Sequence, residues 1–360
     1  MSARAANRLR AVAGLLNSEF SIRGRRRPER PRKILVLHEL LLGDTLMLAP
    51  LFAALRARYP SAEIYASVKP EYAPLFSGRP WGVHALPFTE REPRALKRLA
   101  AAKGCDLAIL PGETRHAVGA RALGAKWIVA FAGAGLKDRL VDERVRLPAR
   151  PASLADMFAS LSGYTGKLSF HPGDWPAPAF GPYERPNAPY AVLHVGAGSP
   201  LRLWQPEKWR AVAEFLYRKG ISPVWSAAKA ERNLIKDIDP KGSYVSLAGR
   251  LDLAQLWDLL ARAERLVALD SGIAHLAKLA GARTVALYGP GSSVLFGRGE
   301  YWRAAPFTEV TIPDFPCRDQ RRIFQRELAW VRRCNRTLAE CPRARCMEAI
   351  GAEQVIAAIH

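Results

Sequence analysis

The chain is short of acidic residues and lacks several common sequence signatures. Its 360 residues include 33 Asp and Glu against 54 Lys and Arg, which gives a formal net charge of +21 at pH 7. No apolar run approaches the about 20 residues of a transmembrane helix, so the sequence predicts no membrane span. A P-loop is absent, the five cysteines include no C-x2-C pair, and no nucleic-acid-binding module is recognisable.

The excess positive charge is concentrated in two segments. Residues 1–33 contain ten Lys and Arg against two Glu, and residues 318–345 contain nine Arg against three acidic residues. Such charge reflects surfaces that meet partners rather than the needs of the fold. An anionic membrane, a polyanionic substrate and a nucleic acid would each explain it.

Residues 1–32 form a basic N-terminal arm. Leu9, Val12 and Leu16 make a weak helical stripe beside arginines, and the stretch from Arg23 to Lys33 is polybasic. An interfacial helix fits this pattern, and so does a disordered, solvated arm. A signal peptide is not expected, because the apolar stretch is short and an arginine-rich stretch follows it without a cleavage-like site.

Alternating strands and helices predict two α/β domains. In residues 33–170 we expect strands at 33–38, 63–68, 106–110 and 126–130, and a helix over 44–58 that Pro50 kinks or restarts. Residues 171–189 contain six prolines and two glycines and predict a linker. In residues 190–345 the pattern restarts, with strands at 190–195, 222–226, 265–269 and 284–288 and helices between them; a final helix is expected over 346–360. The fold class is therefore two doubly wound, Rossmann-like domains that face a central cleft.

Three glycine-bearing corners follow predicted strands. They are Leu42-Gly43-Asp44-Thr45, the stretch His194 to Ser199 with Gly196 and Gly198, and Asp270-Ser271-Gly272 with His275 one helical turn later. Loops at the carboxyl ends of parallel strands face the ligand crevice, and free N–H groups at a helix start suit phosphate. The sequence therefore predicts a phosphate-bearing ligand, with Arg202 placed to hold a diphosphate.

These residues also have a purely structural interpretation. Asp44, Asp270 and Ser271 are types that commonly cap helices, and arginines such as Arg202 are usually solvated on the surface. The second corner lacks the complete G-x-G-x-x-G spacing, so a dinucleotide site is only weakly indicated.

Taken together and in this order, the corners resemble glycosyltransferase family 9, the lipopolysaccharide heptosyltransferases. In that family the first motif is a strand, a G-D corner and a proline-containing helix. The second is a small-residue turn with a basic residue and a W-P-type helix start. The third is D-[ST]-G-x2-H, followed by a strand and G-P. The matching residues are Ile34 to Leu37, Gly43, Asp44, Pro50, Gly196 to Ser199, Arg202, Trp204, Pro206, Asp270, Ser271, Gly272, His275, Gly289 and Pro290. The run His38 to Leu42 departs from the family, which often has a basic residue and small polar residues there.

The resemblance implies a GT-B fold and an inverting transfer that requires no cofactor. A nucleotide-diphosphate sugar, typically ADP-heptose, would be bound by the second domain and an acceptor by the first, with Asp44 as the base on the acceptor hydroxyl. Glu231 falls where the family often contacts the nucleotide ribose. The donor-binding residues implied are Gly196, Gly198, Ser199, Arg202, Glu231, Asp270, Ser271, Gly272 and His275.

Four of the five cysteines lie close together in an Arg-rich segment, residues 314–346. Cys317, Cys334, Cys341 and Cys346 are spaced x16, x6 and x4. Four such thiols predict either a structural Zn or Fe site, a disulfide-stapled segment, or simply reduced cysteines in a helical hairpin.

The favoured hypothesis is a heptosyltransferase that extends a lipid A–Kdo or lipopolysaccharide core acceptor. We expect it in the cytoplasm, peripheral at the inner face of the inner membrane, where the basic segments meet anionic lipid or the anionic groups of the acceptor. A family 9 transferase with a protein acceptor or another nucleotide sugar is an alternative. A basic nucleic-acid-binding protein is a third, but it would leave Asp44 and the corner at Asp270 without a role, so no nucleic-acid partner is expected.

Overall fold

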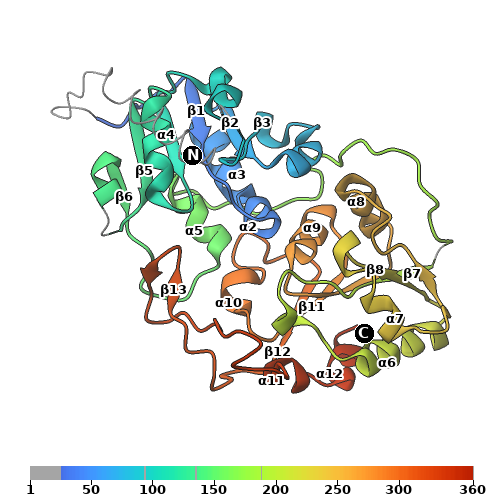
Figure 1. Cartoon of the computed structure of the whole chain (residues 1–360). Coiled ribbons are helices and arrows are strands. Elements are labelled where there is room, and N and C mark those ends of the chain that lie inside the picture. The colour runs from blue at the N-terminus through green and yellow to red at the C-terminus, as the bar shows by residue number, and fades with distance from the viewer. Residues whose placement is uncertain (1–25, 93–94, 134–135, 188, 360) are drawn as a thin grey trace.

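Two six-stranded parallel sheets organise the protein, as the computed structural model of residues 26–92, 95–133, 136–187 and 189–359 shows (Figure 1). The first sheet has the strand order β3-β2-β1-β4-β5-β6 and the second has the order β12-β11-β10-β7-β8-β9. Read from its own first strand, each sheet has the doubly wound order 3-2-1-4-5-6. The predicted fold class is confirmed; the expected interfacial helix, within residues 1–25, lies outside the described residues.

The sequence patterns identify the inner strands of both sheets and miss all four edge strands. Edge strands are short and partly exposed, so they lack the continuous apolar run of a strand that is covered on both faces. The missed edges are β3 (Val83–Pro87), β6 (Glu143–Val145), β9 (Val245–Ser246) and β12 (Phe307–Thr311). The inner strands are β1 (Lys33–Val36), β2 (Glu63–Val68), β4 (Leu107–Leu110), β5 (Trp127–Phe131), β7 (Tyr190–His194), β8 (Ser222–Ser226), β10 (Arg265–Leu269) and β11 (Thr284–Tyr288).

Helices cover both faces of the sheets. Along β1, Ile34 and Val36 join the apolar cluster that contains α3 and α5, whereas Leu35 and Leu37 join the cluster that contains α4. This alternation follows from the two-residue period of a strand. The helices are α2 (Leu42–Leu46), α3 (Ala49–Arg58), α4 (Ala117–Ala122), α5 (Leu154–Ser160), α6 (Pro206–Arg218), α7 (Leu234–Ile238), α8 (Leu253–Ala261), α9 (Gly272–Ala280), α10 (Ser293–Phe296), α11 (Arg345–Glu348) and α12 (Ala352–Ile359).

Two helix predictions change in the structure. The helix expected over 44–58 is divided into α2 and α3, and Pro50 lies in the first turn of α3, where a proline costs no hydrogen bond. The single helix expected over 346–360 is wrong, because α11 ends before Gly351 and α12 begins after it. The N–H of Gly351 donates to Oε1 of Gln354, which is 2.9 Å away and closes the start of α12.

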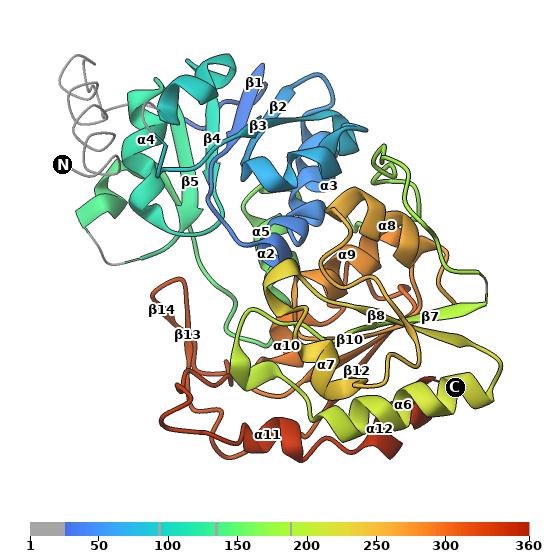
Figure 2. The ribbon, with the colours of Figure 1, turned by 45° about the vertical axis from the view of Figure 1, so that its right-hand side comes forward.

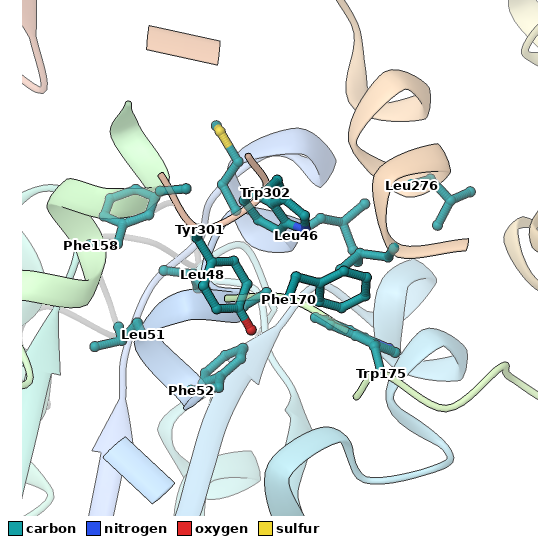
Figure 3. Close-up of a cluster of buried hydrophobic side chains, with 14 of the residues drawn as sticks. Leu46, Leu48, Leu51, Phe52, Phe158, Phe170, Trp175, Leu276, Tyr301 and Trp302 are labelled. Carbon is teal, nitrogen blue, oxygen red and sulfur yellow. The ribbon is translucent and has the colours of Figure 1, made fainter. Parts of the chain in front are cut away.

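Apolar side chains from both halves share one core. Figure 3 shows Leu46 and Phe52 from the first half among the same buried side chains as Tyr301 and Trp302 from the second. The proline-rich stretch 171–189 has no helix or strand in its described residues and runs along the outside (Figure 2). Its Trp175 is buried and donates to the carbonyl of Leu75 at 2.7 Å, so this stretch also contributes to that core.

Candidate active site

The three glycine corners all lie at points where the strand order reverses. In the first sheet the order reverses between β1 and β4, and in the second between β7 and β10. The corners follow β1, β7 and β10, and the crevice at such a reversal is the usual ligand site of an open α/β sheet. Sheet topology therefore places the first corner at the reversal of one sheet and the second and third corners at the reversal of the other.

The first and third corners touch directly across this cleft. A Cβ on Gly43 would lie 2.9 Å from Cδ2 of His275 and 3.4 Å from Cα of Gly272. A Cβ on Gly272 would lie 3.0 Å from the side chain of Leu42. The helices that begin at these corners, α2 and α9, lie side by side in both views (Figures 1 and 2). Both glycines are needed because no side-chain carbon fits between the two halves.

A cavity of about 740 Å³ opens beside this contact. Six of the predicted donor-binding residues line it, whereas Asp44, Ser199, Asp270 and His275 are not in its wall. The first half contributes Leu41, Leu42, Gly43 and Tyr72 to the wall. The six predicted residues, all from the second half, are Gly196, Gly198, Arg202, Glu231, Ser271 and Gly272. The second half also contributes His194, Ala197, Pro200, Leu203, Ala228, Ala230, Asn233, Leu234, Asp237 and Ile273.

Arg202 joins the second corner to the third. Its Nη1 donates to the backbone carbonyl of Asp270 at 2.7 Å, and its Nε lies 3.7 Å from Oδ2 of the same residue. The Arg202 side chain is 30% exposed and borders the cavity, so it is held by the protein yet open to a ligand. A guanidinium fixed in this way is preorganised to hold a phosphate.

Glu231 is held against the second corner. Its Oε1 accepts a hydrogen bond from the N–H of Ala197 at 2.8 Å. A Cβ on Gly196 would lie 2.1 Å from Oε2 of Glu231, so only glycine admits the carboxylate here. Glu231 thereby borders the cavity with one oxygen already engaged; the ribose contact implied by the resemblance stays a prediction.

The third corner contains buried polar atoms without hydrogen-bond partners among the described residues. They are Oδ2 of Asp270, Oγ of Ser271 and Nδ1 of His275. Ser271 occupies the N-cap position of α9, but its hydroxyl makes no capping bond. Unsatisfied buried polar groups are costly, so a ligand that pairs with them gains binding energy. Capping therefore does not account for Ser271.

Burial shifts the pKa values of the ionisable side chains where the first and third corners touch. It raises the pKa of Asp44 to about 6, with the charge of Asp270 adding to the rise and those of Arg333 and Arg202 opposing it. Burial also raises the pKa of Asp270 and lowers that of His275 well below its usual range, so His275 is a neutral imidazole. A carboxylate with a pKa near 6 is ionised at neutral pH and still basic enough to accept a proton.

The second half also matches a known family in sequence. The family model described as Glycosyltransferase family 9 (heptosyltransferase) matches residues 171–326, which include the second and third corners. The sequence likeness to this family is thus shown for that part of the chain, which is less than half of it. Lipopolysaccharide heptosyltransferase 1 of Pseudomonas aeruginosa is 32% identical over 152 residues, which span 39% of this chain and only 42% of that protein.

Solved structures extend the likeness to both halves. The ADP-heptose lipopolysaccharide heptosyltransferase II of E. coli aligns with a TM-score of 0.66 and 20% identity, over 91% of this chain and 97% of that one. E. coli heptosyltransferase WaaC with ADP aligns with a TM-score of 0.63 and 18% identity, over 77% of this chain and 93% of that one. At these identities the likeness shows the fold, which is GT-B.

Two basic residues near the corners were missed by the sequence analysis. Lys278 is buried on α9; its ammonium donates to the carbonyls of Phe296 and Gly297 and lies over the rings of Trp302 and Phe307. Arg333 lies in the Arg-rich segment, and its positive charge lowers the pKa of Asp44 and that of Asp270. The sequence could have pointed to Lys278, because a lysine inside an apolar helix pattern is unusual. Nothing distinguishes Arg333 in the sequence from the other eight arginines of its segment.

The four clustered cysteines do not form the predicted metal site in this structure. Among the described residues, no group of three or more His, Cys, Asp and Glu is arranged to hold a metal ion, and all the cysteines are free thiols. Cys341 and Cys346 are buried in the apolar core of the second half, whereas Cys317 and Cys334 are half-buried. Burial, with the neighbouring cysteine charges, raises the pKa of Cys346 to about 11, so in the metal-free protein this group is a thiol at neutral pH.

We expect Gly43→Ala to separate the two halves locally and to slow any reaction that needs their contact. The added methyl would meet the ring of His275 at 2.9 Å, and a shift of about 1 Å at a reaction centre costs roughly 100-fold in rate. Steady-state kinetics with the donor and acceptor measures this effect. Gly181→Ala is the matched control, because Gly181 lies outside the cavity wall and a Cβ there meets nothing within 4 Å; equal rates for the two variants would contradict the prediction.

Proposed function

We propose that the protein transfers a heptose from ADP-heptose to a lipopolysaccharide inner-core acceptor with inversion at the anomeric carbon. One observation carries this proposal: the Gly43-Asp44 corner packs on the Gly272–His275 corner beside a cavity that Arg202 borders. A base on the acceptor side and a diphosphate site on the donor side are thereby brought to one place. The Pseudomonas relative is named a lipopolysaccharide heptosyltransferase, and E. coli WaaC was solved with ADP, which supports this donor.

The residues suit a direct displacement. The acceptor hydroxyl attacks the anomeric carbon, its proton passes to Asp44, and the bond from that carbon to the diphosphate oxygen breaks with its electron pair leaving on ADP. Arg202 and the free N–H groups at the start of α9 face the charge that develops on the diphosphate. Asp270 holds Arg202 in this position through its backbone carbonyl and its carboxylate.

The acceptor and the membrane surface belong to the same proposal. Among the residues that the structure describes, no helix has the length and apolar character needed to cross a membrane. The basic segments would then bring the enzyme to an anionic surface or bind the phosphates and carboxylates of a lipid A–Kdo acceptor. We infer that the protein works at the inner face of the inner membrane, as a peripheral enzyme of the cytoplasm.

The pH profile of transfer is expected to show a base with a pKa near 6. Asp44 must be ionised to accept the proton, and its pKa is raised to about 6 by burial and by Asp270. We therefore expect kcat/KM to be constant above that pH and to fall tenfold per unit below it. A profile that stays flat down to pH 4.5 would exclude Asp44 as the titrating base.

A thermal-shift panel of nucleotide diphosphates and nucleotide sugars, followed by transfer assays, tests the function. ADP and ADP-heptose are expected to raise the melting temperature more than UDP or GDP and their sugars, because only a ligand that binds the folded state stabilises it. Radiolabelled heptose should then appear on Kdo-lipid A. Stabilisation by another nucleotide sugar alone would identify a different donor. No nucleotide binding, together with DNA binding that weakens steeply with salt, would overturn the proposal.

A further inference from the structure

The Arg-rich segment crosses from the second half of the molecule to the first and returns. Its outward leg ends in a two-stranded hairpin, β13 (Arg322–Ile323) and β14 (Arg326–Glu327), that points toward the first sheet (Figure 2). From the tip, the guanidinium of Arg326 donates to the carbonyls of Gly112, Phe131 and Ala132. Those carbonyls lie at or just after the ends of β4 and β5, so the hairpin is fixed at the carboxyl edge of the first sheet.

The return leg leads Arg333 back to the third corner. Arg333 pairs with Gln320 through two backbone hydrogen bonds of 2.9 and 3.2 Å, and the N–H of Cys334 donates to the carbonyl of Pro290 at 2.8 Å. Pro290 precedes Gly291, where a Cβ would lie 1.9 Å from Oδ2 of Asp270. Backbone contacts alone thus hold Arg333 next to the loop that touches the Asp270 carboxylate.

The side chain of Arg333 differs from the other anchored arginines of its segment. Arg318 and Arg326 each donate several hydrogen bonds to backbone carbonyls. Arg333 is half-buried, yet its guanidinium makes no hydrogen bond or ion pair with any described residue. Burial lowers the pKa of Arg333 and the charge of Arg202 lowers it further, whereas the charges of Asp44 and Asp270 raise it. Arg333 in turn lowers the pKa of Asp44. The N–H donors of this partly desolvated guanidinium are unused within the described residues, so an anion that accepts hydrogen bonds from them gains binding energy.

We propose that Arg333 is a further cation of the reaction centre, which contacts the diphosphate of the donor and stabilises the charge that develops on it as the sugar leaves. This inference rests on the proposed function and names a residue outside the three corners. Arg202 already borders the cavity from the second corner, and Arg333 would add a second positive charge, supplied by the segment that bridges both halves. The bonds that form and break are those of the proposed function: the electron pair of the broken bond goes to the diphosphate, and the proton goes to Asp44.

The kinetic test compares Arg333→Gln and Arg333→Lys with Arg332→Gln. We expect Arg333→Gln to lower kcat about 100-fold and to weaken ADP binding, because one preorganised charge at the leaving group is lost. Arg333→Lys should recover part of the rate, since it keeps the charge without the planar fork. Arg332 is the matched control: it is adjacent and exposed, and it donates only to the carbonyls of Ala329 and Val331.

The pH profile separates a reaction-centre charge from a structural role. The positive charge of Arg333 lowers the pKa of Asp44, so Arg333→Gln should move the acidic limb of kcat/KM to higher pH, whereas loosening of the segment would lower the rate without moving it. Melting curves of all variants check folding. If the wild type transfers heptose and Arg333→Gln behaves as Arg332→Gln does, the inference is overturned. If the wild type neither binds nor transfers from a nucleotide sugar, the proposed function itself has failed.

Discussion

Asp44→Asn is expected to reduce heptose transfer by about 10³-fold while leaving ADP binding nearly unchanged. The amide has almost the shape of the carboxylate but cannot accept the proton of the acceptor hydroxyl. Asp44 is not in the cavity wall that Arg202 and Gly196 border, so the donor site stays intact. Single-turnover kinetics and calorimetric titration with ADP measure the two effects separately. Loss of ADP binding in parallel with activity would mean that Asp44 supports the donor site instead.

The same substitution is expected to stabilise the protein at neutral pH. The folded-state pKa of Asp44 is about 6, above its ordinary 3.8, so between these pH values the unfolded chain releases the proton first and the folded state loses stability as pH rises. The cost is complete above pH 6 and is on the order of 3 kcal/mol. Asparagine carries no charge and avoids it. Melting curves at pH 7.5 and pH 4 should show the gain only at the higher pH.

Glu29→Gln provides the control for both measurements on Asp44. Glu29 is an exposed carboxylate that precedes β1, whereas Asp44 follows that strand, so the two residues lie toward its opposite ends. We expect it to leave transfer, ADP affinity and melting temperature unchanged. A pH-dependent stabilisation of equal size in Glu29→Gln would show that overall charge, rather than the buried site, is responsible.

Arg202→Gln is expected to produce the second large loss, about 100-fold in kcat, together with weaker ADP binding. The guanidinium is held by Asp270 through one hydrogen bond of 2.7 Å and an ion pair of 3.7 Å, and its remaining donors border the cavity. Removing it lowers the positive charge at the diphosphate and leaves the Asp270 carboxylate buried without its partner. Pre-steady-state kinetics with ADP-heptose measures the loss in the chemical step.

Arg202→Lys distinguishes charge from geometry at this position. The variant keeps the positive charge, so it should keep most of the activity, with a moderate loss because a single ammonium replaces a planar fork. Arg218→Gln, an exposed arginine at the end of α6, serves as the surface control. Activity equal to the wild type in Arg202→Gln would assign the arginine to the surface role that its residue type also permits.

The interior of the fold could be predicted from the sequence, whereas its margins could not. Strands such as β1 and β10 are covered by helices on both faces, so they read as continuous apolar runs bounded by polar corners. The edge strands are paired on one side only, and their short or polar sequences carry no comparable signal. The interruption between α11 and α12 was missed for a related reason, since the apolar period continues across Gly351 although the backbone does not.

The sequence by itself determined the residues of the corners and their order, because glycine, small polar residues and helix starts after strands have few other uses in that pattern. It also limited the family through the D-S-G-x2-H motif, which the family model matches. Only the tertiary structure decided that Gly43 lies against His275, that Glu231 is held on Gly196, and that the segment with Arg333 and Cys334 returns to Pro290. Each of these contacts joins residues that are far apart in the chain. Whether they meet depends on the packing of two sheets and on the path of the Arg-rich segment, and local sequence patterns contain neither.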